Sequence, residues 1–298
     1  MPYRADAPDV VLPCRPGDNR ELRYALRSIE RNLPYHHIWI VGSWPAWLRL
    51  DHPRLTAVKR PTLTPKYRTT RAHYRWACES VEVSDPWIMW NDDFYLMHPL
   101  DELPPIHRGR NDQVIPMFAA WHSKWAEGLR QTDAKLKRLM PGTVLYNYDI
   151  HTPLLVHKRH MRRALTVAEA MRIAAPQVRT LYGNFARLGG TQLRDPKYYA
   201  ANTVPARTTW LSSHENTFVS AIEPYLRKAG LTGHSPWEIP GVPDHARTQN
   251  PKASDARYSM SKRRMRYRVL KTPNGNRIVP EQPAPAPARV TNTAGRRR

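Results

Sequence analysis

The sequence predicts an α/β fold in which a mixed, mostly parallel β-sheet is flanked by helices. Three observations support this prediction. Apolar runs typical of strands buried in a parallel sheet occur at residues 9–13, 38–41 and 87–90. A helical pattern separates the first two runs, and strand, helix and strand together take roughly 30 residues, the length of one βαβ unit. Each run also ends in polar or glycine-containing sequence, which is typical of turns.

The segment between the first two strands favours an amphipathic helix. Asp18 or Asn19 is a suitable N-cap for it. Apolar residues recur at steps of four, three and four and therefore share one helical face: Leu22, Leu26, Ile29 and Leu33. Arg23 and Arg27 lie one turn apart on another part of the surface, where they are available either to solvent or to a phosphate group.

Weaker patterns extend the same architecture along the chain. Further strands are expected at residues 55–58, 114–118 and 143–148. Helices are expected at residues 71–81, 121–140, 158–174, 179–188 and 214–228.

Composition limits the class of protein. The chain has 298 residues, of which 41% are hydrophobic, and contains 10 Trp and 14 Tyr, enough to form a core. Two cysteines exclude a disulfide framework, and their spacing fits no zinc finger. The formal net charge of +22 favours anionic partners without choosing among nucleotides, nucleic acid and acidic polymers.

Hydropathy predicts no membrane span. No apolar stretch approaches the roughly 18 residues that a transmembrane helix needs, and the N-terminus lacks the apolar region of a signal peptide. We therefore expect a cytoplasmic protein, located in the host cytoplasm if the chain is phage-encoded.

The composition changes near residue 243, which predicts two parts. Residues 1–242 are expected to form the folded domain. Residues 243–298 are rich in Pro, Lys and Arg and are expected to form a flexible, disordered basic tail. A solubilising extension is the simplest interpretation of the tail, and contact with nucleic acid or another polyanion is the alternative.

The chemistry is expected at Asn91, Asp92 and Asp93, directly after the strand at residues 87–90. Ligands of open parallel sheets bind beyond the carboxyl ends of the strands. Two neighbouring carboxylates at such a position repel each other unless a cation compensates them, and Mg²⁺ or Mn²⁺ prefers carboxylate and phosphate oxygens. The pattern therefore indicates a metal site for a nucleotide-activated donor. The alternative is an ordinary turn stabilised by its Asn and Asp side chains.

Several segments resemble the Stealth family of hexose-1-phosphate transferases. The matching text is "DNRELRYALRSIERNLPYHHIWIVGSWPAWLRLDHPRL" from Asp18 and "WIMWNDDFYLMHPL" from Trp87, with "HTPLLVHKRHM" from His151 and, more weakly, "WLSSHENTF" from Trp210. The segment "RTLYGNFARLGG" from Arg179 is similar to phage-encoded glycosyltransferases. The resemblance covers roughly residues 9–240.

The chain also departs from the family pattern. The first strand runs into "PCRPGDN" where the family has Thr-Trp-Val, and "SHEN" replaces Asn-Asp-Asn near residue 215. Glycosyl transfer and sugar-1-phosphate transfer both stay open for this reason.

The resemblance implies a GT-A-like, Rossmann-like fold and a set of site residues. It implies that Asp92 and Asp93 hold the metal and the diphosphate. It implies catalytic roles for His151 and Asp93. Glu215, with His214, is a further candidate, either to ligate the metal or to activate the acceptor in catalysis. It also implies that the nucleotide donor is bound by Arg15, Asp18, Asn19, Arg23, Arg27 and Asn91. The alternative for residues 15–19 is a simple capped loop. The alternative for Arg23 and Arg27 is that they are solvated charges on the helix surface, and the alternative for His151 is a structural role.

The sequence therefore predicts a metal-dependent glycosyltransferase that uses a nucleotide sugar, with a protein, a glycan or modified DNA as acceptor. The alternative function is a non-catalytic nucleic-acid-binding protein that uses the basic tail. No helix-turn-helix, zinc-finger or RNP motif supports that alternative. A degenerate transferase kept as a structural protein is a third possibility.

Overall fold

The computed structural model describes residues 4–64, 66–199, 208–233 and 235–242, and the backbone of residues 267–272 and 275–280. The chain forms two compact units, Met1–Ala246 and Arg247–Arg298. The expected boundary at residue 242 lies close to this division and stays a prediction.

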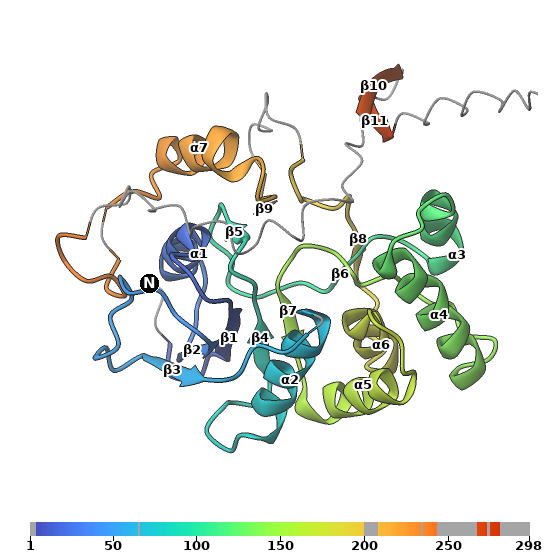
Figure 1. Ribbon diagram of the computed structural model, residues 1–298, viewed down its shortest axis with the longest axis horizontal. Helices are drawn as coiled ribbons and strands as arrows, with labels where there is room; N and C mark the ends of the chain where they lie inside the picture. The colour runs from blue at the N-terminus through green and yellow to red at the C-terminus, as the bar shows by residue number, and fades with distance from the viewer. Residues whose placement is uncertain are drawn as a thin grey trace, which may run out of the picture. The chain divides into compact units, whose positions relative to one another are not determined.

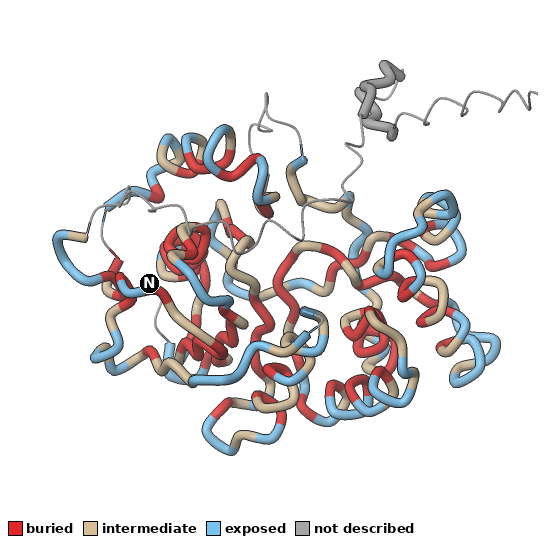
Figure 2. Tube along the Cα trace, in the orientation of Figure 1, coloured by how far each residue is buried: buried red, intermediate tan, exposed pale blue. Residues whose placement is uncertain are grey.

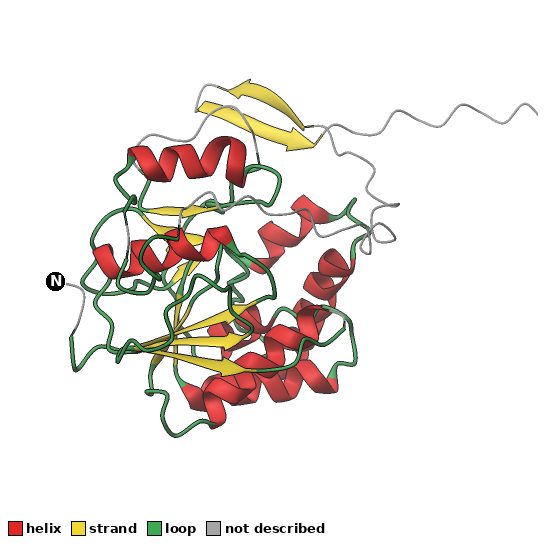
Figure 3. Cartoon of the chain, turned by 60° about the vertical axis from the view of Figure 1, so that its left-hand side comes forward, coloured by secondary structure: helices red, strands yellow, loops and turns green. Residues whose placement is uncertain are grey.

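The first unit is built on a five-stranded sheet with the strand order β3-β2-β1-β4-β7. The strands are β1 (Asp9–Cys14), β2 (Ile38–Gly42), β3 (Leu55–Lys59), β4 (Trp87–Met89) and β7 (Leu154–Val156). The first four strands in this order run parallel, and β7 pairs antiparallel with β4. The predicted mixed, mostly parallel sheet with flanking helices is therefore confirmed (Figure 3).

Side chains alternate between the two faces of the sheet, and each face packs on a separate core. Val10 and Leu12 join the core that contains the buried face of α1 (Arg20–Asn32). Val11 points to the opposite face and joins the second core. Four helices contribute to that second core: α2 (Lys66–Glu79), α4 (Lys124–Leu139), α5 (Lys158–Ala170) and α6 (Val178–Phe185). Figure 2 shows the sheet and α1 as mostly buried.

Two small sheets bring distant parts of the first unit together. β5 (Phe94–Leu96) pairs antiparallel with β9 (Trp210–Ser212). β6 (Ile106–His107) pairs parallel with β8 (Thr191–Gln192). Because β5 follows β4 after a short turn, the first of these pairings places residues 212–213 beside the end of β4 (Figure 1).

The expected strands at residues 114–118 and 143–148 were wrong. The first segment belongs to a helical turn, α3 (Asn111–Val114), and a 3₁₀ helix, η1 (Ile115–Phe118). Pro116 lies in the first turn of η1, where its missing N–H costs no hydrogen bond. The second segment is a loop that forms a single bridge, Arg110 to Tyr146. Short apolar runs do not distinguish strand from helix by periodicity.

The remaining helices agree with expectation in type. α4 covers Lys124–Leu139 and starts at Ser123, whose hydroxyl accepts a hydrogen bond from the Ala126 amide at 3.2 Å. The expected helix at residues 214–228 is a π-helix, η2 (Phe218–Ile222), followed by α7 (Glu223–Lys228). No helix within the described residues is both long and apolar enough to span a membrane.

The second unit contains a backbone hairpin, in which β10 (Tyr267–Thr272) pairs antiparallel with β11 (Gly275–Pro280). The expectation of a tail flexible along its whole length did not include this pairing. The rest of the predicted tail lies outside the described residues, and so does the polyanion contact expected of it.

A buried ion cluster fixes the last described loop of the first unit to α1. The Glu238 carboxylate accepts hydrogen bonds from Arg23 Nη1 at 2.7 Å and from Arg27 Nε and Nη2 at 2.8 Å each. The Arg23 and Glu238 side chains are 2% and 0% exposed. Breaking such a cluster leaves uncompensated charge in the interior.

We predict that Glu238→Gln lowers the free energy of unfolding by about 3–5 kcal/mol, because both guanidinium groups lose their anionic partner. Urea denaturation measures this change. The control is Glu79→Gln, which removes an exposed partner of Arg75 and should cost under about 1 kcal/mol. Equal effects of the two substitutions would show that the buried cluster contributes little.

Candidate functional site

Asp92 and Asp93 lie in the turn that connects β4 to β5. The Phe94 amide donates to the Asn91 carbonyl across this turn at 3.2 Å. β4 lies in the interior of the sheet between β1 and β7, so the turn is at the carboxyl edge of the parallel strands. The turn that contains the acid pair therefore lies at the edge of the sheet where the sequence analysis expects a ligand to bind. The two carboxylates are 20% and 16% exposed, which leaves both within reach of a ligand.

Asp92 is held by the loop after β1. Asn19 Nδ2 donates to Asp92 Oδ2 at 2.8 Å, and Arg15 Nε lies 3.8 Å from the same oxygen. Asn19 is the N-cap of α1 and adopts a left-handed backbone with φ 44°, which Asn tolerates better than most residues. Its Oδ1 atom is buried without a hydrogen-bond partner.

Asp93 is held by residues from another part of the chain. Lys197 Nζ donates to Asp93 Oδ2 at 2.9 Å, and Ser212 Oγ donates to the same oxygen at 3.4 Å. The Ser213 amide donates to the Asp93 carbonyl at 3.2 Å. The β5–β9 pairing therefore positions Ser212 against the Asp93 carboxylate and Ser213 against the Asp93 backbone carbonyl.

Glu21, in the first turn of α1, is a third carboxylate in this cluster. Its Oε2 accepts from Arg15 Nη2 at 3.0 Å, and its Oε1 accepts from Ser213 Oγ at 2.5 Å. Ser213 Oγ also lies 2.9 Å from the Tyr95 hydroxyl. Burial, and to a smaller extent the charge of Asp93, raises the pKa of Glu21.

The cluster contains more negative than positive groups. Burial and the neighbouring Asp93 raise the pKa of Asp92 to about 6. Burial by itself would lower the pKa of Arg15, but the surrounding carboxylates, including the exposed Glu215, raise it. Together with the acid pair itself, the described site contains the carboxylates of Glu21 and Glu215 and the cationic groups of Arg15 and Lys197. Four carboxylates therefore face two cations. This excess of negative charge suits a bound cation.

A divalent cation fits the described donor set. No group of three or more His, Cys, Asp or Glu residues within the described residues has metal-binding geometry. A cation here would therefore rely on Asp92 and Asp93, with water and donor phosphates as further ligands, which is the usual arrangement for Mg²⁺. The unpartnered Asn19 Oδ1 is a further oxygen beside Asp92.

His151 lies at the same edge of the sheet. It precedes β7, and Leu154 at the start of β7 pairs with Met89 at the end of β4. Its Nδ1 lies 2.9 Å from both carboxylate oxygens of Asp195, and its amide donates to Asp195 Oδ1 at 3.2 Å. Its ring packs edge-on against Phe94, with 6.0 Å between the ring centroids.

Asp195 and Lys197 connect the two halves of the site. Asp195 contacts His151, and Lys197, two residues later, contacts Asp93. The Lys197 amide donates to Asp195 Oδ1 at 3.4 Å, which fixes the geometry of this short segment. Asp195 also pairs with Arg108.

The structure brings together most of the predicted site residues. Arg15, Asn19, Asp92 and Asp93 lie in one cluster, and the exposed Glu215 lies close enough to affect the Arg15 charge. Asn91 accepts from the Tyr74 hydroxyl at 3.4 Å, and the Asp18 carbonyl accepts from Trp47 Nε1 at 2.6 Å. These two are therefore placed beside the cluster by interactions of their own.

Arg23 and Arg27 are not part of this cluster. Both guanidinium groups bind Glu238 in the interior, as described above. Their expected role in binding the nucleotide therefore has no support in this geometry. Helical spacing alone cannot reveal a buried partner that is more than 200 residues away in sequence.

Five residues of the site were not predicted: Glu21, Asp195, Lys197, Ser212 and Ser213. Ser213 lies within the segment that resembles the family's fourth region, so its position was available from the sequence. Asp195 and Lys197 carry no local signal, because an Asp and a Lys in a polar loop are ordinary surface residues.

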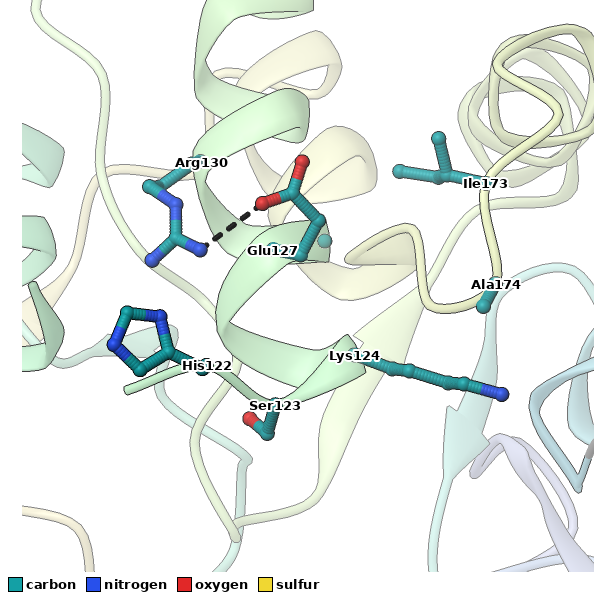
Figure 4. Close-up of a pocket in the computed structure, with 8 residues that line it drawn as sticks. His122, Ser123, Lys124, Glu127, Arg130, Ile173 and Ala174 are labelled. Atoms are coloured by element: carbon teal, nitrogen blue, oxygen red, sulfur yellow. Dashed lines mark hydrogen bonds and ion pairs between the residues drawn. The ribbon is translucent and has the colours of Figure 1, made fainter. Parts of the chain in front are cut away.

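Two pockets among the described residues lie elsewhere. One has a volume of about 330 Å³ and lies at the start of α4, where residues 122–130 meet Ile173 and Ala174 (Figure 4). The second, of about 310 Å³, lies between α4 and the end of α5. Neither is lined by Asp92, Asp93 or His151.

Comparisons with known proteins find sugar phosphotransferases. Over 51 residues the chain is 59% identical to the mouse N-acetylglucosamine-1-phosphotransferase subunits alpha/beta, and over 44 residues it is 59% identical to the human protein. These matches cover 16% and 14% of this chain and 4% of each relative. An exopolysaccharide phosphotransferase of Streptomyces coelicolor is 34% identical over 93 residues, which are 27% of this chain and 15% of the relative. No protein-family model matches the chain.

The predicted resemblance to hexose-1-phosphate transferases is therefore supported over part of the chain, while the phage-encoded relatives stay a prediction. Among solved structures, the galactosyltransferase LgtC with donor and acceptor sugar analogues gives a TM-score of 0.42 at 12% identity, covering 76% of this chain and 97% of LgtC. An active-site mutant of LgtC gives 0.46 with the same identity and coverage. Mouse xyloside xylosyltransferase 1 gives 0.35 at 8% identity, covering 70% of this chain and 99% of that protein.

We predict that Asp92→Asn stabilises the metal-free protein at pH 7.5. A carboxyl with a pKa of about 6 when folded and 3.8 when unfolded opposes folding once it is ionised. The penalty is complete above pH 6, reaches about 3 kcal/mol at most, and disappears below the unfolded pKa. The variant should therefore unfold at a higher temperature than wild type at pH 7.5 in EDTA, and at an equal temperature near pH 3.5.

The control for this measurement is Asp101→Asn, which neutralises an exposed carboxylate outside the cluster. It should leave the unfolding temperature close to that of wild type throughout the pH range. A pH-independent effect of Asp92→Asn would contradict the electrostatic explanation.

Proposed function

We propose that this chain is a metal-dependent transferase with a GT-A-like fold that uses a nucleotide-activated sugar donor. The observation that carries the proposal is the pair Asp92 and Asp93 at the carboxyl edge of the sheet, with cationic side chains on both sides. Parts of the chain also match proteins that are named as sugar phosphotransferases, and this similarity is a second, independent support for the proposal.

The diphosphate of the donor would bind at this pair. Asp92 and Asp93 would hold Mg²⁺ or Mn²⁺, and the donor phosphates would supply further oxygen ligands. A divalent cation bound there neutralises charge that develops on the departing nucleotide. Arg15 is 59% exposed and lies at the entrance to the pair, where its guanidinium can bind a phosphate oxygen directly.

The nucleotide end of the donor would lie near the loop after β1. Asn19 and Arg15 of this loop already contact Asp92, and Asp18 lies between them, directly before the N-cap residue of α1. Asn91 is the first residue of the turn that contains the acid pair, and a hydrogen bond from Tyr74 holds it in place. Glu215 is exposed, and its charge acts on Arg15; we propose that it contacts either the cation or the acceptor.

His151 would act as the general base. A proton leaves the acceptor hydroxyl for His151, and the acceptor oxygen forms a bond with the electrophilic centre of the donor. In glycosyl transfer that centre is the sugar C1 atom, and a nucleoside diphosphate leaves with the electrons of the C1–O bond. In sugar-1-phosphate transfer the centre is the β-phosphorus, and a nucleoside monophosphate leaves.

The acceptor class and the location of the protein remain proposals. A protein, a glycan or modified DNA each offers a hydroxyl group to such a base. We propose a cytoplasmic location, since the described residues contain no helix that could cross a membrane and nucleotide sugars are expected there.

We predict that a nucleotide sugar raises the unfolding temperature of the wild-type protein only when Mn²⁺ is present. A ligand that binds the native state stabilises it according to its occupancy. The panel is UDP-glucose, UDP-N-acetylglucosamine, GDP-mannose and TDP-glucose, each with Mn²⁺ or with EDTA. Asp92→Asn should abolish the shift, and Asp101→Asn should keep it.

The absence of any metal-dependent shift across the panel would contradict the proposal. A shift that is equal in EDTA would contradict only the metal requirement. With a binding donor in hand, chromatography of the released nucleotide separates the two bond types, because glycosyl transfer releases the diphosphate and sugar-1-phosphate transfer releases the monophosphate.

A further inference from the structure

The His151 ring is held in one orientation by a carboxylate that the sequence did not indicate. Its Nδ1 atom lies 2.9 Å from both oxygens of Asp195, and its own amide donates to Asp195 Oδ1 at 3.2 Å. An ionised carboxylate only accepts hydrogen bonds, so Nδ1 must carry the proton in this arrangement. The lone pair of neutral His151 is therefore on Nε2.

Asp195 is itself fixed and ionised. Arg108 pairs with it, and the Arg108 guanidinium lies 5.8 Å from the ring centroids of both Phe118 and Trp125. Burial would raise the pKa of Asp195, but the hydrogen bond from His151 and the positive charge of Arg108 lower it far below its usual range. The side chain is 15% exposed, so little solvent competes for it.

The free edge of His151 belongs to the same site as the acid pair. Phe94, which packs against the His151 ring, directly follows Asp93 in sequence. Lys197, two residues after Asp195, binds Asp93. A donor held at Asp92 and Asp93 would therefore lie at the edge of the sheet where His151 is oriented.

We propose that Asp195 is a positioning residue that holds the Nδ1–H tautomer of His151, so that Nε2 takes the proton of the acceptor hydroxyl. This inference rests on the proposed function. The proton moves from the acceptor to Nε2, the acceptor oxygen bonds to the donor, and the nucleotide leaves with the electrons of the broken bond. Asp195 keeps its charge and stabilises the imidazolium that forms.

Other charged groups surround this pair. Arg108 acts on His151 through Asp195. Asp149 is tied to Trp125 Nε1 at 2.6 Å, and the Arg179 guanidinium lies 5.8 Å from the Phe94 ring centroid. Lys197 is engaged by Asp93. A substitution at Asp195 changes the ion pair of Arg108, whereas the contacts of Asp149 with Trp125 and of Lys197 Nζ with Asp93 do not involve Asp195.

We predict that Asp195→Asn lowers kcat by at least about 100-fold, because an amide can donate to Nδ1 and place the remaining proton on Nε2. The assay is nucleotide release from the same four nucleotide sugars with Mn²⁺ and water as acceptor. The donor KM should stay within threefold of the wild-type value, and the metal-dependent thermal shift should equal that of wild type within error, because the Lys197–Asp93 contact is kept. The acid limb of the residual pH–rate profile should move to lower pH.

Two further variants separate orientation from mere packing. Asp195→Glu keeps the charge and should restore at least a tenth of the wild-type kcat. His151→Ala should be as defective as Asp195→Asn, and the double variant should be no worse than either single one, because the two residues act as a unit. Full activity of Asp195→Asn, failure of Asp195→Glu to rescue, or multiplicative losses in the double variant would overturn the inference.

A spectroscopic test is independent of activity. The ¹⁵N shifts of His151, assigned by comparison with His151→Gln, should report the Nδ1–H tautomer at pH 8 in wild type and a loss of that preference in Asp195→Asn. An Nε2–H tautomer in wild type would overturn the inference. If no donor is bound or cleaved by wild type but the tautomer is as stated, the proposed function fails and the histidine geometry stands.

Discussion

The compensation of two neighbouring carboxylates is the constraint on which the rest of the site depends. Asp92 and Asp93 lie in the turn after a buried strand, where water can screen their charge only partly. Each is compensated by a different part of the chain: the loop after β1 holds the first, and residues 197 and 212 hold the second. The strand order that puts β4 between β1 and β7 makes this possible, since it brings loops far apart in sequence to one edge.

Elements with a strong local pattern could be predicted from the sequence. The apolar runs of β1, β2 and β4 and the spacing of α1 identified the centre of the sheet, and the edge that carries the acid pair followed from it. The short run at residues 114–118 misled, because a single turn of helix and a short strand have the same apolar content. The antiparallel β7 and the pairing of β5 with β9 depend on contacts of long sequence separation and left no local pattern.

The same distinction applies to the site. Asp92 and Asp93 can be recognised from the sequence, because two adjacent acidic residues after an apolar strand repel each other unless a cation compensates them. Asp195 and Lys197 become significant only when the fold places them against His151 and Asp93. Arg23 illustrates the opposite case: it looked available for a ligand, and only the fold reveals that Glu238 occupies it. The partial matches to sugar phosphotransferases support the transfer of a sugar or a sugar phosphate, while the geometry indicates which side chains can take part in it.

The cluster of Glu238 with two arginines of α1 has a practical consequence for chain design. Glu238 lies only four residues before the last described residue of the first unit, Val242, and it closes a contact with the first helix of the fold. A chain truncated ahead of residue 238 would leave two interior guanidinium groups without their anion. The shortest stable fragment for expression and crystallisation therefore has to retain this glutamate, even when the whole basic extension beyond it is removed.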